Sequence, residues 1–253
     1  MSFRKIFTLL LVCILVQPIY SQKLRRDHER ELSVGATGGL GLSRVSFLHN
    51  NVYRANELGN QGFCMGYRFG GVVRFISQNH FGVQIEANYV RSGWSEIFHE
   101  DVGVAMVNGY DMQDVTLSRR NHYIEIPMLS HIYFGSRNVR FFVELGPEIS
   151  MLVRYGELKT NLSENDERWA AFPNDDPRLK DQYNRVDFGL TGGLGLDIKT
   201  GPFHTIIGGR YTYGFADLYN HSKADVFQRS NNQLMNVTAT FLIPVLKYTE
   251  RKR

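Results

Sequence analysis

The residues most able to do chemistry are arginines and carboxylates on the polar faces of otherwise apolar stretches. Six of each kind occupy such positions: Arg68, Arg74, Glu86, Glu125, Arg140, Glu144, Glu148, Arg154, Arg185, Asp187, Asp197 and Arg210. Guanidinium and carboxylate groups pair in forked geometry, so this set predicts ion pairs in a confined space. A catalytic alternative is that Glu125 and Glu148 share a proton, as acid pairs in hydrolases do. The interpretation we favour is that Arg68, Arg154 or Arg210 bridges these two acids.

Other signals of catalysis or metal binding are weak. The sequence has no Gly-x-Ser-x-Gly elbow, no His-Glu-x-x-His helix and no paired cysteine ligands. His122, His131 and His204 fit polar filling of an interior better than a role as catalytic bases. The turn Asn174-Asp175-Asp176 could touch Ca²⁺, but without the spaced oxygen ligands of a calcium loop it is better interpreted as a solvated acidic turn. We therefore predict no catalytic residue, no metal ligand and no cofactor.

The elements that carry these charges are long strands with one apolar and one polar face. In the clearest one, from Phe63 to Phe75, large apolar side chains alternate with Gly66, Arg68, Gly70 and Arg74. Successive side chains of a strand point to opposite faces. Soluble strands run about five to six residues, whereas a tilted strand that crosses a bilayer needs about nine to eleven. The length favours a membrane-spanning strand.

Eight such stretches predict an all-β fold, an eight-stranded antiparallel up-and-down transmembrane β-barrel. We expect strands near 32–43, 63–76, 80–91, 121–134, 139–155, 185–198, 203–215 and 233–248. Compact turns rich in Gly, Asn, Ser and Pro follow the second, fourth and sixth strands, and the other connections are long and polar. Short turns at one rim and long loops at the other are typical of the periplasmic and extracellular ends of an outer-membrane barrel.

The N-terminus predicts export. Arg4 and Lys5 precede the apolar run Ile6 to Val16, and a weak cleavage signal, Ile19-Tyr20-Ser21, follows it. We expect residues 1–21 to be a cleaved signal peptide, because the run is shorter than the roughly twenty residues of a membrane anchor, and residues 22–253 to form the barrel domain. Cleavage leaves one cysteine, Cys64, so no intramolecular disulfide is expected. It also lowers the formal net charge from +4 to +2, which argues against a nucleic-acid partner.

Alternation alone does not say which face points inward, and a soluble lipocalin-like barrel would turn its apolar face to the inside. Paired arginines and carboxylates suit a confined lumen, so we expect the apolar face to meet lipid. The predicted lipid face includes Val139, Phe141, Val143, Leu145, Ile149, Met151, Val153, Val186, Phe188, Leu190, Leu194, Leu196 and Ile198. Aromatic residues predict two interface girdles: Phe75, Phe81, Phe134, Phe203 and Tyr248 near the turns, and Tyr89, Trp94, Tyr155, Tyr213 and Phe215 near the loops.

Centring the fourth and fifth strands on the turn 135–138 places Glu125 opposite Glu148, and Pro127 opposite Gly146 and Pro147. Proline donates no ladder hydrogen bond, so we expect a bulge or a local break there. Glycines of the sixth and seventh strands are expected to face the interior and leave room for long charged side chains: Gly189, Gly193, Gly195, Gly208 and Gly214. The network would centre on Glu125, Glu144, Glu148, Arg154 and Arg210.

Four short motifs resemble the porin-like or PorT-like outer-membrane β-barrel family of Bacteroidetes. They are Tyr123-Ile124-Glu125-Ile126-Pro127-Met128-Leu129, Leu145-Gly146-Pro147, Asp187-Phe188-Gly189 with Gly192-Gly193-Leu194-Gly195, and Gly209-Arg210-Tyr211. The resemblance covers the fourth to seventh strands. It implies an eight-stranded barrel in the outer membrane without enzyme activity, and one branch of that family assists protein secretion.

Two classes of function remain open at this point. The first is a non-enzymatic barrel that acts as scaffold, receptor or secretion accessory, and the second is a small porin-like channel for ions or small solutes. Eight strands enclose an interior that side chains can fill, and the charged residues would occupy it, which favours the first. A lipid-modifying enzyme would need a nucleophile and a base on the lipid-facing surface, and we find none. The expected partners are outer-membrane lipid and lipopolysaccharide, and a protein bound through the long extracellular loops or the periplasmic rim.

Overall fold

The computed structural model describes residues 28–49, 60–78, 80–97, 106–107, 110–111, 113–135, 138–163, 165–168, 184–218 and 227–250. The predicted signal peptide and the acidic turn Asn174-Asp175-Asp176 lie outside these residues. Eight long strands in the described part form the barrel: β1 (His28–His49), β2 (Asn60–Gln78), β3 (Phe81–Ile97), β6 (Thr116–Gly135), β7 (Val139–Thr160), β8 (Val186–Thr200), β9 (Phe203–Asp217) and β10 (Phe227–Glu250). No helix in this part is long and apolar enough to cross a membrane.

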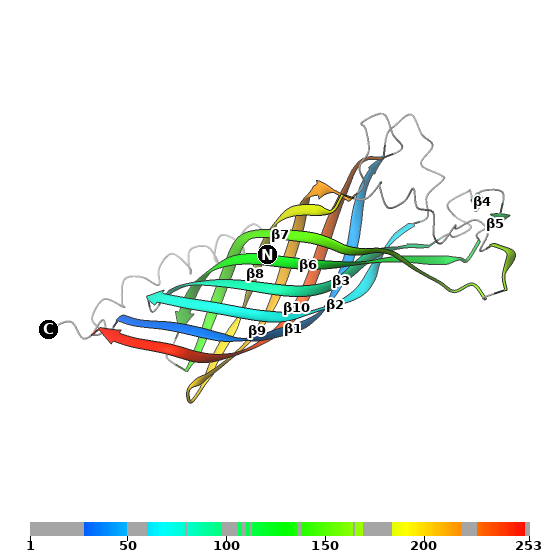
Figure 1. Ribbon diagram of the computed structural model, residues 1–253. Helices are drawn as coiled ribbons and strands as arrows, with labels where there is room; N and C mark the ends of the chain where they lie inside the picture. Colours follow the sequence, from blue (N-terminus) through cyan, green and yellow to red (C-terminus); the bar gives the residue numbers. More distant parts are fainter. Residues whose placement is uncertain are drawn as a thin grey trace, which may run out of the picture.

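The strands close into one antiparallel barrel in the order β1-β10-β9-β8-β7-β6-β3-β2, so chain neighbours pair and β1 seals the ring against β10. This confirms the predicted eight-stranded up-and-down fold. Tight connections join β2 to β3, β6 to β7 and β8 to β9 at one rim, which we call the turn end, and the other rim is the loop end. The first residues of β1 and the last of β10 also lie at the turn end (Figure 1).

All eight expected strands are present, but most run further than predicted at the loop end. For example, β1 continues to His49, β7 to Thr160, and β10 begins at Phe227. These extensions fall in segments expected to be loops, which also contain a small hairpin, β4 (Met106–Val107) with β5 (Tyr110–Asp111). Alternation marks a strand only where one face is apolar. Beyond the bilayer both faces can be polar, so that signal is lost.

The two faces of the barrel differ as expected for a membrane protein. Along β3 and β6 buried and exposed residues alternate, with polar side chains such as Gln84 and His131 buried and apolar ones such as Ile85 and Ile132 exposed. The predicted lipid face is on the outside, with Ile149 and Ile198 partly covered. The apolar side chains therefore face outward, which is the reverse of a soluble lipocalin-like barrel.

The register between β6 and β7 differs from the prediction. Glu125 pairs with Ser150, and Pro127 with Glu148, because the pairing starts at Gly135 and Arg140. The shift leaves both acids on the interior face, since a strand repeats every two residues. At Pro127 the ladder with β3 is interrupted but resumes in the same register on either side, at Ile85 with Met128 and Asn88 with Glu125. The ladder is interrupted there without a register shift, which confirms the second of the two expected alternatives, a bulge or a local break.

Register shifts occur at several other places in the barrel. Between β1 and β10 the register shifts near Pro244, and between β6 and β7 it shifts on both sides of His122. In the second case Tyr123 pairs with Leu152 and His122 with Arg154, so Val153 is the extra residue. A bulge reverses the alternation of the residues beyond it, because two residues of one strand oppose one of the other.

Candidate functional site

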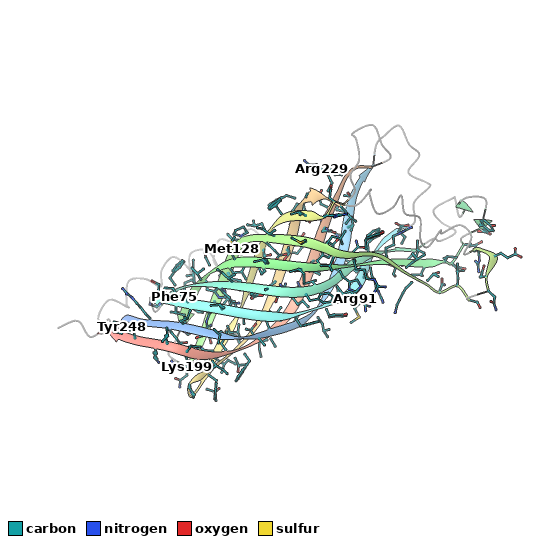
Figure 2. The ribbon with its side chains drawn as sticks, in the orientation of Figure 1. Phe75, Arg91, Met128, Lys199, Arg229 and Tyr248 are labelled. Atoms are coloured by element: carbon teal, nitrogen blue, oxygen red, sulfur yellow. The ribbon has the colours of Figure 1, made fainter. Side chains whose placement is uncertain are left out.

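The interior of the barrel is the candidate site, because it collects most of the charged residues singled out in the sequence. Ten of the twelve charged residues singled out in the sequence are at least partly buried and point inward: Arg68, Arg74, Glu86, Glu125, Arg140, Glu144, Glu148, Asp187, Asp197 and Arg210. Asp187 is only partly buried and lies beside Gly214. The strands tilt across the barrel (Figure 2), and side chains far apart in the sequence, such as Glu86 and Arg210, meet in the lumen.

Arg210 of β9 is the centre of the network. Its Nε and Nη2 donate to Glu144 at 2.5 and 3.2 Å, and its Nη1 and Nη2 contact the two carboxylate oxygens of Glu86 at 2.9 and 2.8 Å. Glu86 also accepts from Gln84 and Asn88 of its own strand. The guanidinium thus joins β9 to β7 and, across the lumen, to β3. Forked arginine–carboxylate pairs of this kind are among the stronger hydrogen-bonded contacts in proteins.

Arg68 holds the next layer toward the loop end with looser geometry. Its Nη2 lies 3.8 Å from Glu86 and 3.7 Å from Glu125. The three guanidinium nitrogens of Arg68 and Oε2 of Glu125 have no hydrogen-bond partner among the described residues. Arg68 is therefore the arginine nearest Glu125, whereas Arg210 pairs with other acids. Glu148 is held by Thr191 at 2.7 Å and contacts Ser150 at 3.5 Å.

A second cluster lies toward the turn end around Asp197. Its carboxylate accepts from Arg74 at 3.1 Å, from Arg140 at 2.6 Å and contacts His204 Nδ1 at 2.8 Å. The other ring nitrogen of His204 lies 3.0 Å from Glu31. Arg140 also stacks over the ring of Tyr133, 4.4 Å from its centroid. This cluster ties β1, β2, β7, β8 and β9 together.

Apolar clusters fill the lumen beside the charged layers. Val72, Tyr133, Phe142, Ile206 and Leu242 pack together toward the turn end. A second group lies toward the loop end and consists of Val45, Trp94 and Leu218, with Leu152 and Tyr155 against it. Trp94 is only 2% exposed, so it belongs to this cluster and not to the predicted aromatic girdle. The lumen is thus filled by ion pairs and apolar side chains in alternating layers.

Interior glycines make room for these large side chains, as expected from the sequence. A Cβ at Gly193 would lie 2.6 Å from Glu144 Oε1 and 3.0 Å from Arg210 Cγ. At Gly195 it would lie 2.8 Å from Phe142 Cζ, and at Gly214 2.3 Å from Asp187 Oδ2. Only a residue without a side chain leaves enough space at these positions.

Two predicted members are outside the network. Arg154 is exposed, because the bulge at Val153 reverses the alternation of β7 and turns Arg154 to the outer face. Arg185 is exposed at a bend just before β8. Sequence reasoning missed Glu31, which lies beyond the stretch expected as the first strand. It also missed that Tyr133 and Phe142 fill part of the lumen. Pairs of consecutive aromatic residues, Tyr133 with Phe134 and Phe141 with Phe142, were the available signal for that filling.

The opening beside the acids of the network is small. A cavity of about 30 Å³ lies beside Glu125, Glu148 and Asp187 near the loop end, and it is lined also by Tyr123 and Thr212. That volume suits water and is too small for a sugar or an amino acid. Among the described residues, no group of three or more His, Cys, Asp or Glu side chains is arranged to hold a metal ion.

An apolar outer surface around a charged interior is the arrangement of a barrel in lipid, and the family comparison agrees with it. Residues 20–220 match the family model described as outer membrane protein beta-barrel domain. The chain belongs to this family. It is therefore a protein of the outer membrane. A comparison with curated proteins found no match.

Several solved structures resemble the fold at low identity. Ail, the attachment invasion locus protein of Yersinia pestis, in complex with the heparin analogue sucrose octasulfate, is 13% identical, with a TM-score of 0.38, over 84% of this chain and 99% of that chain. OprG of Pseudomonas aeruginosa is 12% identical, with a TM-score of 0.42, over 90% and 98%. Outer membrane protein W of E. coli is 13% identical, with a TM-score of 0.36, over 86% and 99%.

Proposed function

We propose that this chain is a non-enzymatic outer-membrane protein that acts as a scaffold, receptor or secretion accessory through its rims and loops. The observation that supports this most is the filled lumen. Arg210 joins Glu86 and Glu144 across the interior, and apolar layers lie toward each end. A diffusion channel needs a continuous aqueous path, so the alternative of a small porin-like channel is less favoured.

The surfaces left for recognition are the lipid-facing wall, the loop end and the turn end. We propose that the loop end is extracellular and the turn end periplasmic, as the connection lengths favour. Lipid and lipopolysaccharide would contact the wall, and a protein partner would bind at either rim. The four motifs between Tyr123 and Tyr211 favour the Bacteroidetes porin-like branch, and a role like that of its secretion-accessory members is one form of this proposal.

Planar-bilayer recording tests the proposal directly. The purified wild-type protein should give no stable conductance steps. A variant that combines Glu86→Ala, Glu144→Ala, Arg210→Ala, Phe142→Gly and Trp94→Gly should conduct, because it removes the central ion pairs and one aromatic side chain from the apolar layer toward each end. Heat-modifiable migration on gels would establish that this variant forms a barrel. Stable steps from the wild type would overturn the proposal in favour of the channel.

A further inference from the structure

The bulge at Val153 turns Arg154 to the outer wall of the barrel, level with a second arginine. Beyond the bulge, Arg154 of β7 is exposed and pairs in register with His122 of β6, which pairs with Arg91 of β3. Paired residues of neighbouring strands share a face, so all three face outward, although His122 is covered by its neighbours and only 6% exposed. Strands are spaced about 4.8 Å apart, so the two arginines lie about 10 Å apart on the wall. We call these two arginines, with His122 between them, the outer cationic row.

The arginines of this row differ from those of the lumen in having no acidic partner among the residues that the structure describes. Arg68, Arg74, Arg140 and Arg210 all lie within 4 Å of a carboxylate. By contrast, within the described part of the chain no carboxylate forms an ion pair with Arg91 or Arg154. Nε of Arg91 is buried and also lacks a hydrogen-bond partner there. Arg91 is partly exposed and Arg154 is exposed, so both guanidinium groups present donors to an external anion, apart from the buried Nε of Arg91.

Aromatic side chains contact Arg91 and His122 in this row. Arg91 lies over the ring of Tyr67, 5.2 Å from its centroid, and His122 Nδ1 is 2.6 Å from the hydroxyl of Tyr89. Phe69 in turn packs against Tyr89 with ring centroids 5.4 Å apart. Aromatic residues of this kind mark the boundary between hydrocarbon and headgroups.

The position of the row along the strand agrees with that boundary. The outer face of β3 is apolar from Phe81 to Ala87 and ends with Tyr89 before Arg91. Ten residue steps separate Phe81 from Arg91, which is about 33 Å along a strand and about 25 Å across the membrane at the usual tilt. An apolar band about 25 Å tall is typical of outer-membrane barrels, so the row lies at headgroup level. Arg91 and the turn-end residue Phe75 lie toward opposite ends of the barrel (Figure 2).

We propose that the outer cationic row binds a phosphate group on the headgroup of an anionic lipid in the leaflet at the loop end. Guanidinium groups bind phosphate through two parallel hydrogen bonds, and two of them about 10 Å apart suit a headgroup with more than one phosphate. In the orientation given under Proposed function, on which this inference rests, that leaflet is the outer one, where the anionic lipid is a phosphorylated glycolipid. The site would fix the rotation of the barrel relative to its lipid neighbours.

The test uses the full barrel in nanodiscs that contain a neutral phospholipid with either a diphosphorylated glucosamine-based glycolipid or the same glycolipid after removal of its phosphates. Native mass spectrometry counts the glycolipid retained after detergent extraction. The wild type should prefer the phosphorylated form. In the variant Arg91→Gln with Arg154→Gln, the ratio of phosphorylated to dephosphorylated glycolipid retained should be roughly thirtyfold lower than in the wild type. Each cation near an anionic surface raises the affinity for anionic lipid about fivefold.

A matched control is Arg229→Gln. Arg229 is an exposed arginine toward the loop end of β10, where its register partner is Leu48 and not a cation. This variant removes one positive charge, as the single variant Arg154→Gln does, and should retain the wild-type preference. The single variant Arg154→Gln keeps the test valid if the double variant does not fold, because Arg154 is exposed and forms no hydrogen bond with the described residues.

An unchanged preference in the folded double variant, or an equal loss in Arg229→Gln, would overturn the inference, since binding would then reflect net charge and not this row. These outcomes are independent of the proposed function. Loss of the lipid preference leaves the conductance of the filled lumen unchanged, and a conducting wild type would leave the lipid measurement intact.

Discussion

At the scale of single residues, Arg210 shows how a charged lumen is kept stable. Removing an ion from water costs several kcal/mol, and attraction to partners repays this only when the geometry is good. Arg210 meets that condition with two carboxylates, and Gly193 makes space for both its side chain and Glu144. The network therefore depends on residues that carry no charge as much as on those that do.

We expect Arg210→Ala to destabilise the barrel by about 3 to 5 kcal/mol, because it leaves Glu86 and Glu144 buried without their cation. Thermal unfolding in detergent, followed by circular dichroism and by heat-modifiable migration, would measure the loss as a lower midpoint. Arg229→Ala removes an exposed arginine and should shift the midpoint little. If both variants unfolded at the wild-type temperature, the lumen would be hydrated enough to screen its charges.

Two adjacent glycines offer a sharper test of the packing. Gly193→Ala should destabilise the protein by about 1 to 3 kcal/mol, since its Cβ would lie 2.6 Å from Glu144 and 2.7 Å from the backbone oxygen of Gly209. Gly192→Ala should be tolerated, because its Cβ points outward and would meet Leu145 at 3.4 Å. Equal midpoints for the two variants would argue that the interior can relax around an added methyl group.

At the scale of strands, alternation located all eight barrel elements, since within the bilayer it follows from the contrast between lipid and lumen. It could not locate the ends of β1, β7 and β10, which continue beyond that contrast. Nor could it locate the bulge at Val153, because bulges leave no sequence signal in an exposed apolar residue. That one residue explains why Arg154 was expected in the network and lies outside it.

The register of β6 with β7 was also beyond sequence reasoning, although its consequence for the site was small. The turn pairs Gly135 with Arg140, which moves Glu125 from Glu148 to Ser150. Because the shift is even, the faces of both strands stay as predicted. Which residues face the lumen was therefore largely predictable, whereas which acid meets which arginine required the closed barrel.

The lipid face gives a prediction for a whole strand. Leu190 lies in the outward apolar row of β8. Leu190→Arg should therefore lower the stability of the inserted barrel by about 2 to 4 kcal/mol, the cost of a cation near the bilayer midplane, and so impair assembly. Val186 lies on the same face at the loop end of β8, where Val186→Arg should cost about 0 to 1 kcal/mol. The fraction of heat-modifiable protein in membranes reports both effects. Equal assembly of the two variants would be inconsistent with a lipid-facing wall at Leu190.

At the scale of the molecule, the barrel has two ends of different character. The turn end closes with tight connections and contains the cluster of Asp197, whereas the loop end carries long strand extensions, the outer cationic row and the hairpin of β4 and β5. Recognition of a large partner needs a surface outside the bilayer, and the strand extensions and the hairpin provide one at the loop end (Figure 1). The role of this protein therefore depends on which side of the membrane that end faces.

Surface labelling of intact cells would determine this orientation. Single cysteines at Glu167, exposed after β7, and at Asn138, exposed in the turn between β6 and β7, would be introduced with Cys64→Ser. We expect a membrane-impermeant maleimide to label the cysteine at 167 on intact cells and the one at 138 only after lysis. Cys64 is buried, so the wild type should stay unlabelled on intact cells. Labelling at 138 alone on intact cells would invert the barrel, place the outer cationic row in the periplasmic leaflet, and make the turn end the surface that meets extracellular partners.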